Sequence, residues 1–312
     1  MKSASEFRRQ LLGGLLTSGL LPGGLLNVAR GQSAPPELPN LPKLRVVASF
    51  SILADMLREV GGAAVDVTAL VGPNADAHVF EPSPADVQRV ARADLVVING
   101  LGFEGWIDRL IRSSGYRGNV VVATVGIQPR QLDGVADPHA WQSLALAQRY
   151  IENLRAGLVN ARPTQATLFN ALAADYQRRV STLHQSVLQR LATVPVADRR
   201  VVTSHDAFGY FAAAYGVEFK APQGWSTASQ ASAADVARIV RQLKAQRVRA
   251  LFIENVSDPK LLERIASEAG ARVGGTLYSD ALSPPGTAGD SYLRLFEHNA
   301  ATLLAALGAR PQ

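Results

Sequence analysis

Three of the five histidines and one aspartate lie where an α/β protein can place metal ligands. His78, His205 and Asp280 each lie in a loop after an apolar run that predicts a strand, and His139 stands at the start of a predicted helix. Ligands of α/β sheets gather in the loops at the carboxyl ends of the strands. Three neutral imidazoles and one carboxylate form a suitable tetrahedral donor set for zinc, and a nitrogen-rich set ranks zinc above manganese. Because no local motif such as His-Glu-x-x-His is present, these residues suggest a metal site without establishing it.

The segments that must position these residues alternate between strand and helix patterns. Ser83, Pro84 and Asp86 form a helix start, with a capping hydroxyl, a proline in the first turn and a carboxylate near the positive end of the helix dipole. Apolar, β-branched runs predict the first four strands at residues 44–49, 65–71, 95–99 and 120–123. The same pattern predicts four later strands at residues 200–203, 217–220, 250–253 and 272–276.

The middle of the chain, residues 141–194, is helical in pattern, with a break near Arg162 and Pro163. Its second part alone makes a helix of roughly 40 Å, long enough to run the length of a domain. We therefore predict an α/β fold of two lobes, each with a parallel sheet flanked by helices, joined by one long backbone helix, with the metal site in the interlobe cleft. The expected divisions are an N-terminal lobe at 44–163, a linking helix at 164–194 and a C-terminal lobe at 195–312.

The first residues have the features of an export signal. Arg8 and Arg9 precede an apolar stretch, residues 11–28, and small residues follow near Ala34. An ordinary secretory signal and a twin-arginine signal both fit this pattern. We expect a cleaved signal peptide at residues 1–33 and a proline-rich spacer at 34–43.

The chain contains no cysteine. It therefore offers no attachment point for a lipoprotein anchor, no disulfide and no thiolate ligand. The formal net charge is +6 and no block of lysine and arginine stands out, so nucleic acid is not an expected partner. The mature protein is expected to be soluble in the periplasm.

The chain resembles the zinc/manganese class of ABC-transporter substrate-binding proteins. The resemblance spans about residues 45–308, in family order, through six segments at 71–84, 137–141, 204–211, 251–255, 258–262 and 277–282. It implies a periplasmic protein that binds a divalent metal, zinc or alternatively manganese, through His78, His139, His205 and Asp280. It also implies delivery to a membrane permease with its ATPase, a monomeric state, and a periplasmic metallochaperone as an optional further partner.

Three departures from that class bear on the choice of metal. The long histidine-rich loop of many zinc members is missing, since residues 126–137 are few and include no histidine. Gln230 stands where the class usually has glutamate at the start of a helix, although Ser232 and Asp235 can still cap that helix. The third ligand position is His205, whereas manganese members often have glutamate there. This last difference favours zinc.

Other residues and functions compete with this interpretation. A zinc hydrolase would use the same four residues with Glu81 or Glu254 as a base, but it needs an open coordination position. A metal-stabilised adhesin is the other alternative. His184 and His298 are interpreted as structural or solvated. Asp76, Asp137 and Asp206 neighbour the ligands, and they are either acceptors for imidazole N–H groups or surface turn residues. For Glu254, structural hydrogen bonding is favoured over metal contact.

Overall fold

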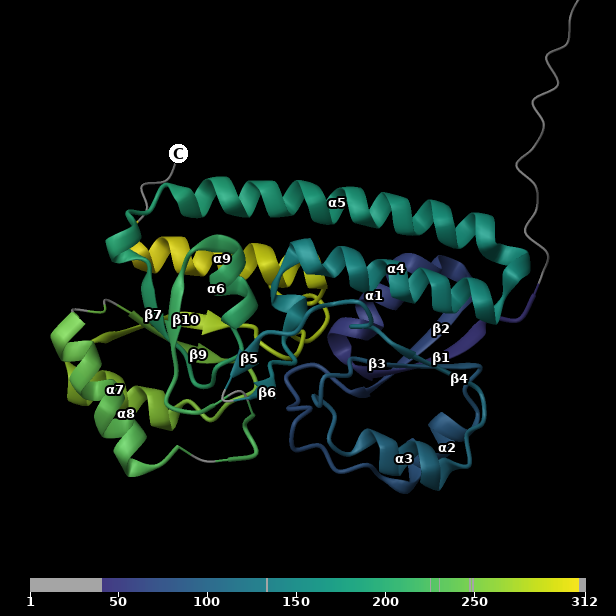
Figure 1. Ribbon diagram of the computed structural model, residues 1–312, viewed down its shortest axis with the longest axis horizontal. Coiled ribbons are helices and arrows are strands. Elements are labelled where there is room, and N and C mark those ends of the chain that lie inside the picture. Colours follow the sequence, from purple (N-terminus) through teal and green to yellow (C-terminus); the bar gives the residue numbers. More distant parts are fainter. Residues whose placement is uncertain are drawn as a thin grey trace, which may run out of the picture. The chain divides into compact units, whose positions relative to one another are not determined.

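The predicted strands form two parallel four-stranded sheets, each flanked by helices (Figure 1). The structure is a computed structural model that describes residues 41–132, 134–224, 226–229, 231–246, 248 and 250–308. The predicted signal peptide and most of the predicted spacer lie outside the described residues, as does Gln230. Among the described residues, no helix combines the length and apolar character needed to cross a membrane.

The first sheet belongs to the N-terminal lobe. Its strands, in sheet order, are β2 (Val65–Val71), β1 (Leu44–Phe50), β3 (Leu95–Ile98) and β4 (Asn119–Val122). The central strand β3 is buried throughout because helices cover both faces, and this explains its continuous apolar sequence. The covering helices are α1 (Ser51–Gly61), α2 (Pro84–Ala91), α3 (Ile107–Ser114) and α4 (Leu144–Ala161). In Figure 1, α1 and α4 lie on the opposite face of this sheet from α2 and α3.

The second sheet belongs to the C-terminal lobe and repeats the topology of the first. Its strands, in sheet order, are β8 (Glu218–Lys220), β7 (Arg200–Val202), β9 (Ala250–Glu254) and β10 (Arg272–Leu277). In each sheet the first strand of the lobe pairs with the second on one side and the third on the other, so each lobe has a switch point where ligands of α/β sheets bind. The helices of this lobe are α6 (Gly209–Tyr215), α7 (Ala233–Gln246), α8 (Lys260–Ala269) and α9 (Tyr292–Leu307).

Helix α5 (Ala166–Ala192) spans both lobes in 27 residues. It contacts α1 and α4 of the N-terminal lobe and α6 and α9 of the C-terminal lobe (Figure 1). A 3₁₀ turn at Pro163–Gln165 separates it from α4, at the break that the sequence predicts. Its apolar stripe is buried through Phe169, Ala173, Tyr176, Val180, Val187 and Leu191. The prediction of two lobes joined by one long helix is confirmed.

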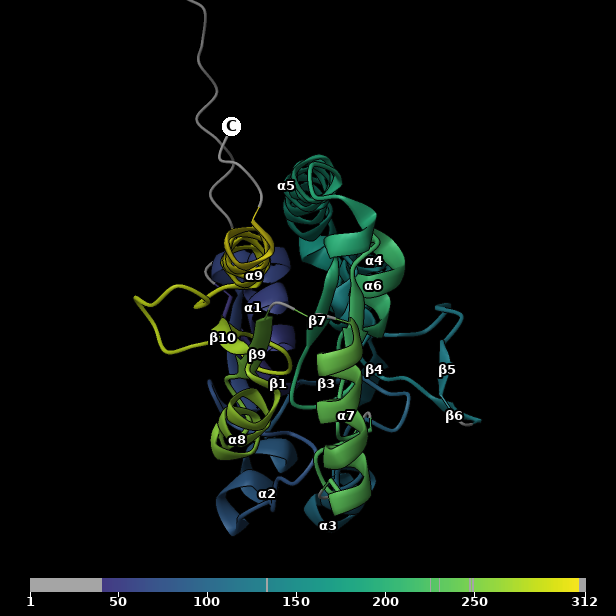
Figure 2. The same ribbon diagram turned by 90° about the vertical axis from the view of Figure 1, so that its left-hand side faces the viewer.

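Some local predictions are refined by the structure. The predicted helix start at α2 is confirmed, and its carboxylate also completes a capping box, since Asp86 N–H donates to Ser83 Oγ and Ser83 N–H donates to Asp86 Oδ2. A hairpin of two short strands, β5 (Gln131–Leu132) and β6 (Val135–Ala136), was not predicted. Two-residue strands carry no readable alternation, so the sequence shows only a loop there. Figure 2 shows this hairpin apart from both sheets.

A partly buried carboxylate joins the two lobes near α5. Asp55 of α1 accepts a hydrogen bond from the N–H of Tyr292, the first residue of α9, at 2.8 Å. Burial raises the pKa of Asp55 to about 6, and the nearby Glu59 and Asp290 add to this, against the opposing effects of Tyr292 and Arg58. Because the folded pKa exceeds the unfolded one, the folded state binds more protons between about pH 4 and about pH 6, and the stability decreases as the pH rises through that window.

We expect Asp55→Asn to remove this loss of stability. The amide keeps an acceptor for Tyr292 but has no charge to bury, so the free energy of unfolding should decrease less between about pH 4 and about pH 7, by up to about 3 kcal/mol. Urea unfolding of the metal-free protein across this range measures the effect. Asp66→Asn, at an exposed position of β2, is the matched control and should keep the wild-type pH dependence. Equal pH dependence in wild type and Asp55→Asn would contradict the prediction.

Candidate metal centre

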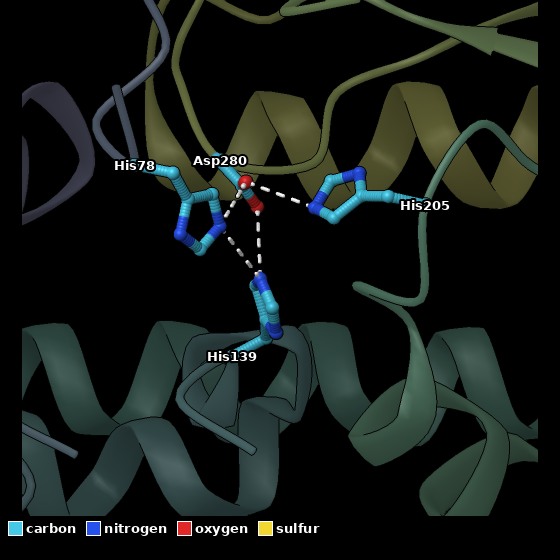
Figure 3. Close-up of side chains that lie close together, drawn as sticks. All are labelled: His78, His139, His205 and Asp280. Atoms are coloured by element: carbon cyan, nitrogen blue, oxygen red, sulfur yellow. Dashed lines mark hydrogen bonds and ion pairs between the residues drawn. The ribbon is translucent and has the colours of Figure 1, made fainter. Parts of the chain in front are cut away.

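Four loops at the carboxyl ends of strands converge on one point between the lobes. His78 follows β2 and His139 follows β6, both in the N-terminal lobe, while His205 follows β7 and Asp280 follows β10 in the C-terminal lobe. One potential ligand atom from each of these four residues lies within 4.8 Å of the others. Figure 3 shows the four side chains pointing toward one another. The structure therefore brings together all four residues that the sequence singled out.

The carboxylate of Asp280 faces all three imidazoles. Its Oδ2 lies 3.1 Å from Nε2 of His205 and 3.3 Å from Nε2 of His78, and its Oδ1 lies 3.7 Å from Nε2 of His139. The four side chains are at most 2% exposed. Among the described residues, neither oxygen of Asp280 nor Nε2 of His205 makes a hydrogen bond of good geometry. Buried polar atoms without hydrogen bonds are unfavourable, and a cation held among them would satisfy all of them.

A carboxylate orients His139. Asp137 Oδ1 lies 2.8 Å from Nδ1 of His139 and accepts its backbone N–H at 3.0 Å, which leaves Nε2 directed at the other ligands. The ring of Trp141 packs edge-on against His139, and the indole N–H donates to the carbonyl oxygen of Ser279, the residue before Asp280. Asp137 thus acts as the imidazole acceptor that the sequence offered as one of two possibilities.

A second carboxylate orients His205. Oε1 of Glu254, at the end of β9, accepts the backbone N–H of His205 at 2.9 Å, and Oε2 lies 2.7 Å from its Nδ1. Both side chains are fully buried. Glu254 is therefore a structural hydrogen-bond acceptor for the backbone of His205, as predicted, and its second oxygen lies in close contact with Nδ1 of the ring.

The loop of His78 is held in a different way. Asp76 Oδ1 accepts the backbone N–H of His78 at 2.9 Å, and the indole of Trp106 donates to the carbonyl oxygen of Ala77 at 2.8 Å. The ring of Phe103 packs edge-on against the His78 ring. Asp76 consequently fixes the backbone of the ligand loop.

Buried polar groups under the site connect the loops of the N-terminal lobe. Glu104 accepts hydrogen bonds from the Ser49 hydroxyl at 2.5 Å and from the Asn99 N–H at 2.6 Å. The amide of Asn99 in turn donates to the carbonyl oxygen of Pro138, next to His139, at 3.0 Å. The loop of His139 therefore rests on a hydrogen-bonded base.

The electrostatics of the site favour an ionised carboxylate. Burial would raise the pKa of Asp280, but His205 and His139 hold this pKa well below its usual range. Burial would likewise lower the pKa of His205, but Glu254 and Asp280 outweigh it and hold this pKa well above the ordinary value. A metal cation that replaces the proton of His205 would therefore meet an ionised Asp280 carboxylate.

The remaining histidines lie elsewhere. His184 on α5 contacts the hydroxyl of Tyr215 through Nδ1 at 3.0 Å, and His298 on α9 contacts the carbonyl oxygen of Thr276 through Nε2 at 2.9 Å. Both contacts lie away from the four candidate ligands, in keeping with the interpretation of these histidines as structural or solvated. Asp206 follows His205, and its pKa is raised by burial and by the charge of Asp137.

Comparison with known proteins gives the family. The model of the family described as zinc-uptake complex component A periplasmic (ZnuA) matches residues 46–306. The chain belongs to this family. It is a metal-binding substrate-binding protein of an ABC transporter, and this agrees with the resemblance found in the sequence. As a ZnuA-family transport component it is not an enzyme, so the hydrolase alternative is wrong.

Individual relatives carry names for different metals. The zinc-binding protein TroA of Treponema pallidum is 32% identical over 84% of this chain and 88% of its own length, and its solved structure matches with a TM-score of 0.83 over 86% of this chain and all of that one. The manganese-binding lipoprotein MntA of Bacillus subtilis is 32% identical over 85% of this chain and 90% of its own. The iron-binding protein YfeA of Yersinia pestis is 31% identical over 85% of this chain and 87% of its own length. Membership of the family therefore leaves the metal open.

Proposed function

We propose that this ZnuA-family protein captures zinc through His78, His139, His205 and Asp280 and delivers it to the permease and ATPase of an ABC importer. The observation that carries the proposal is the convergence of three imidazoles and one buried carboxylate within 4.8 Å of one another. This is a tetrahedral donor set of the kind that zinc accepts. Manganese is the alternative cargo.

The donor types support zinc over manganese. Manganese prefers carboxylate and carbonyl oxygens, whereas three of the four donors here are nitrogens. The two orienting carboxylates, Asp137 and Glu254, lie against the far nitrogens of His139 and His205. They fix the orientation of the ligating imidazoles without supplying oxygen to the metal.

We further propose the cellular setting that the sequence suggests. The lobes extend over residues 44–163 and 195–312, with 164–194 as the linking helix. The chain acts as a periplasmic monomer after cleavage of residues 1–33, and a metallochaperone is an optional partner. Since the chain has no cysteine, we propose export without lipid attachment, unlike the relatives named as lipoproteins. The mass of the exported chain measures both cleavage and lipid attachment.

Competition titration tests the proposed cargo. The protein is stripped with a chelator and then titrated with Zn²⁺ and with Mn²⁺ against a chromophoric competitor. We expect one zinc per chain, and zinc affinity above manganese affinity by several orders of magnitude. In a zinc-bound structure, all four ligand atoms should lie about 2.0–2.2 Å from the ion. Two of the four lying more than about 4 Å away would refute the ligand assignment.

A further inference from the structure

The hydroxyl of Tyr210 lies at the base of the β5–β6 hairpin and bonds to both of its sides. It donates to the carbonyl oxygen of Asp137 at 2.9 Å and accepts the backbone N–H of Arg130 at 2.9 Å. The hairpin base is itself closed by the Asp137 N–H, which donates to the carbonyl oxygen of Arg130 at 2.8 Å. Tyr210 is 4% exposed and belongs to α6 of the C-terminal lobe, while the hairpin belongs to the N-terminal lobe.

The neighbouring residue on α6 fits the same junction. A Cβ atom on Gly209 would lie 2.8 Å from Oδ2 of Asp137 and 2.9 Å from Nε of Arg130. A side chain at position 209 would therefore require the Asp137 carboxylate or the Arg130 guanidinium to shift. The Arg130 guanidinium is 3.6 Å from Asp137 Oδ2 and lies over the Tyr210 ring at 5.8 Å from its centroid.

Each side of this junction leads directly to a metal ligand. Asp137 orients the ring of His139, as described above. On the other side, α6 begins shortly after His205, whose carbonyl oxygen accepts the N–H of Ala207 at 3.0 Å. A movement of Tyr210 relative to the hairpin would thus separate a ligand of one lobe from a ligand of the other.

We propose that Tyr210 is a positioning residue that couples His139 to His205 across the two lobes and thereby sets how fast the metal leaves. The inference rests on the proposed function, because it assumes that these two histidines hold the cargo. Release requires the ligands of the two lobes to separate, and the Tyr210 hydroxyl bonds must break when they do. These bonds therefore slow dissociation and have little effect on association.

Tyr210→Phe is the direct test. It keeps the ring and removes both hydroxyl hydrogen bonds, and it leaves the Arg130 N–H without this acceptor. We expect zinc to dissociate about tenfold faster into excess chelator, as followed by stopped flow, with the association rate nearly unchanged. Tyr215→Phe is the matched control, because Tyr215 is on the same helix, is 3% exposed, and contacts His184 of α5. It should release zinc at the wild-type rate.

Gly209→Ala gives a second, independent test. Gly209 is the first residue of α6, and the alanine methyl group would press on Asp137 and Arg130. We expect faster zinc release, and the urea midpoint of the metal-free protein measures separately any effect on the fold. Wild-type release rates in both Tyr210→Phe and Gly209→Ala, or equal acceleration in Tyr215→Phe, would overturn the coupling. Such results leave the proposed function intact if the wild type binds one zinc, whereas a wild type that binds none overturns both.

Discussion

Asp280→Asn is expected to lower the zinc affinity by at least about a thousandfold. Asp280 is the only anionic member of the proposed ligand set, and its side chain is fully buried among three imidazoles. The amide has nearly the same shape, so the substitution removes charge without creating a cavity. Losing one buried, paired charge corresponds to about 3–5 kcal/mol, and a thousandfold change in affinity is about 4 kcal/mol. Competition titration against a chelator of known affinity measures the change.

A matched substitution separates this effect from a general change of charge. Asp290 lies ten residues further on, where its carboxylate accepts the N–H of Gly286 and pairs with Arg294, away from the site. Asp290→Asn should bind zinc as the wild type does. Circular dichroism of both metal-free variants shows whether they are folded. Zinc affinity within about tenfold of wild type in folded Asp280→Asn would exclude Asp280 as a ligand.

The fold was readable because its determinants are local. Short stretches of sequence are enough to predict its elements. Examples are the apolar runs of β1 and β2, the cap of α2 at Ser83 and the apolar stripe of α5. Three of the candidate ligands, His78, His205 and Asp280, could be proposed from the sequence because they follow predicted strands, and loops after parallel strands lie at one edge of a sheet. His139 stands instead at the start of a predicted helix. The resemblance to a family then assigned these residues, two from each lobe, to a single metal site.

The supporting residues were less readable because their partners are distant in sequence. Glu254 contacts His205 across 49 positions, and Tyr210 contacts Arg130 across 80. No periodicity connects such pairs, since the connection depends on how β9 lies beside β7 and how α6 meets the hairpin. Asp137 could be named because it lies two residues from His139, but its role depended on the direction of its side chain.

His205→Glu is expected to narrow the preference for zinc over manganese by at least about tenfold. Glutamate can offer two oxygens and raise the coordination number, and this suits manganese better than a nitrogen-rich tetrahedron does. The added negative charge should strengthen the binding of both ions. Only the ratio of the two affinities is therefore diagnostic.

Glu254 complicates this substitution in a way that can be controlled. Its Oε2 lies 2.7 Å from Nδ1 of His205, so a glutamate at position 205 would place two carboxylates side by side in a buried site. Like charges in a buried site destabilise the protein or favour protonation of one of the two groups. Either outcome would weaken the binding of both metals. The informative variant is therefore His205→Glu combined with Glu254→Gln, with Glu254→Gln alone as its control.

The test is a pair of titrations, with Zn²⁺ and with Mn²⁺, on the wild type, the Glu254→Gln control and the double variant. Together they show which metal is preferred and whether His205 is a ligand. Glu254→Gln should weaken zinc binding about 10- to 100-fold, as expected for loss of an orienting carboxylate, and should keep the wild-type order of metals. The double variant should show a smaller zinc-to-manganese ratio than this control. If the wild type prefers manganese, the zinc assignment is wrong. If the ratio is the same in the control and in the double variant, His205 is not a ligand.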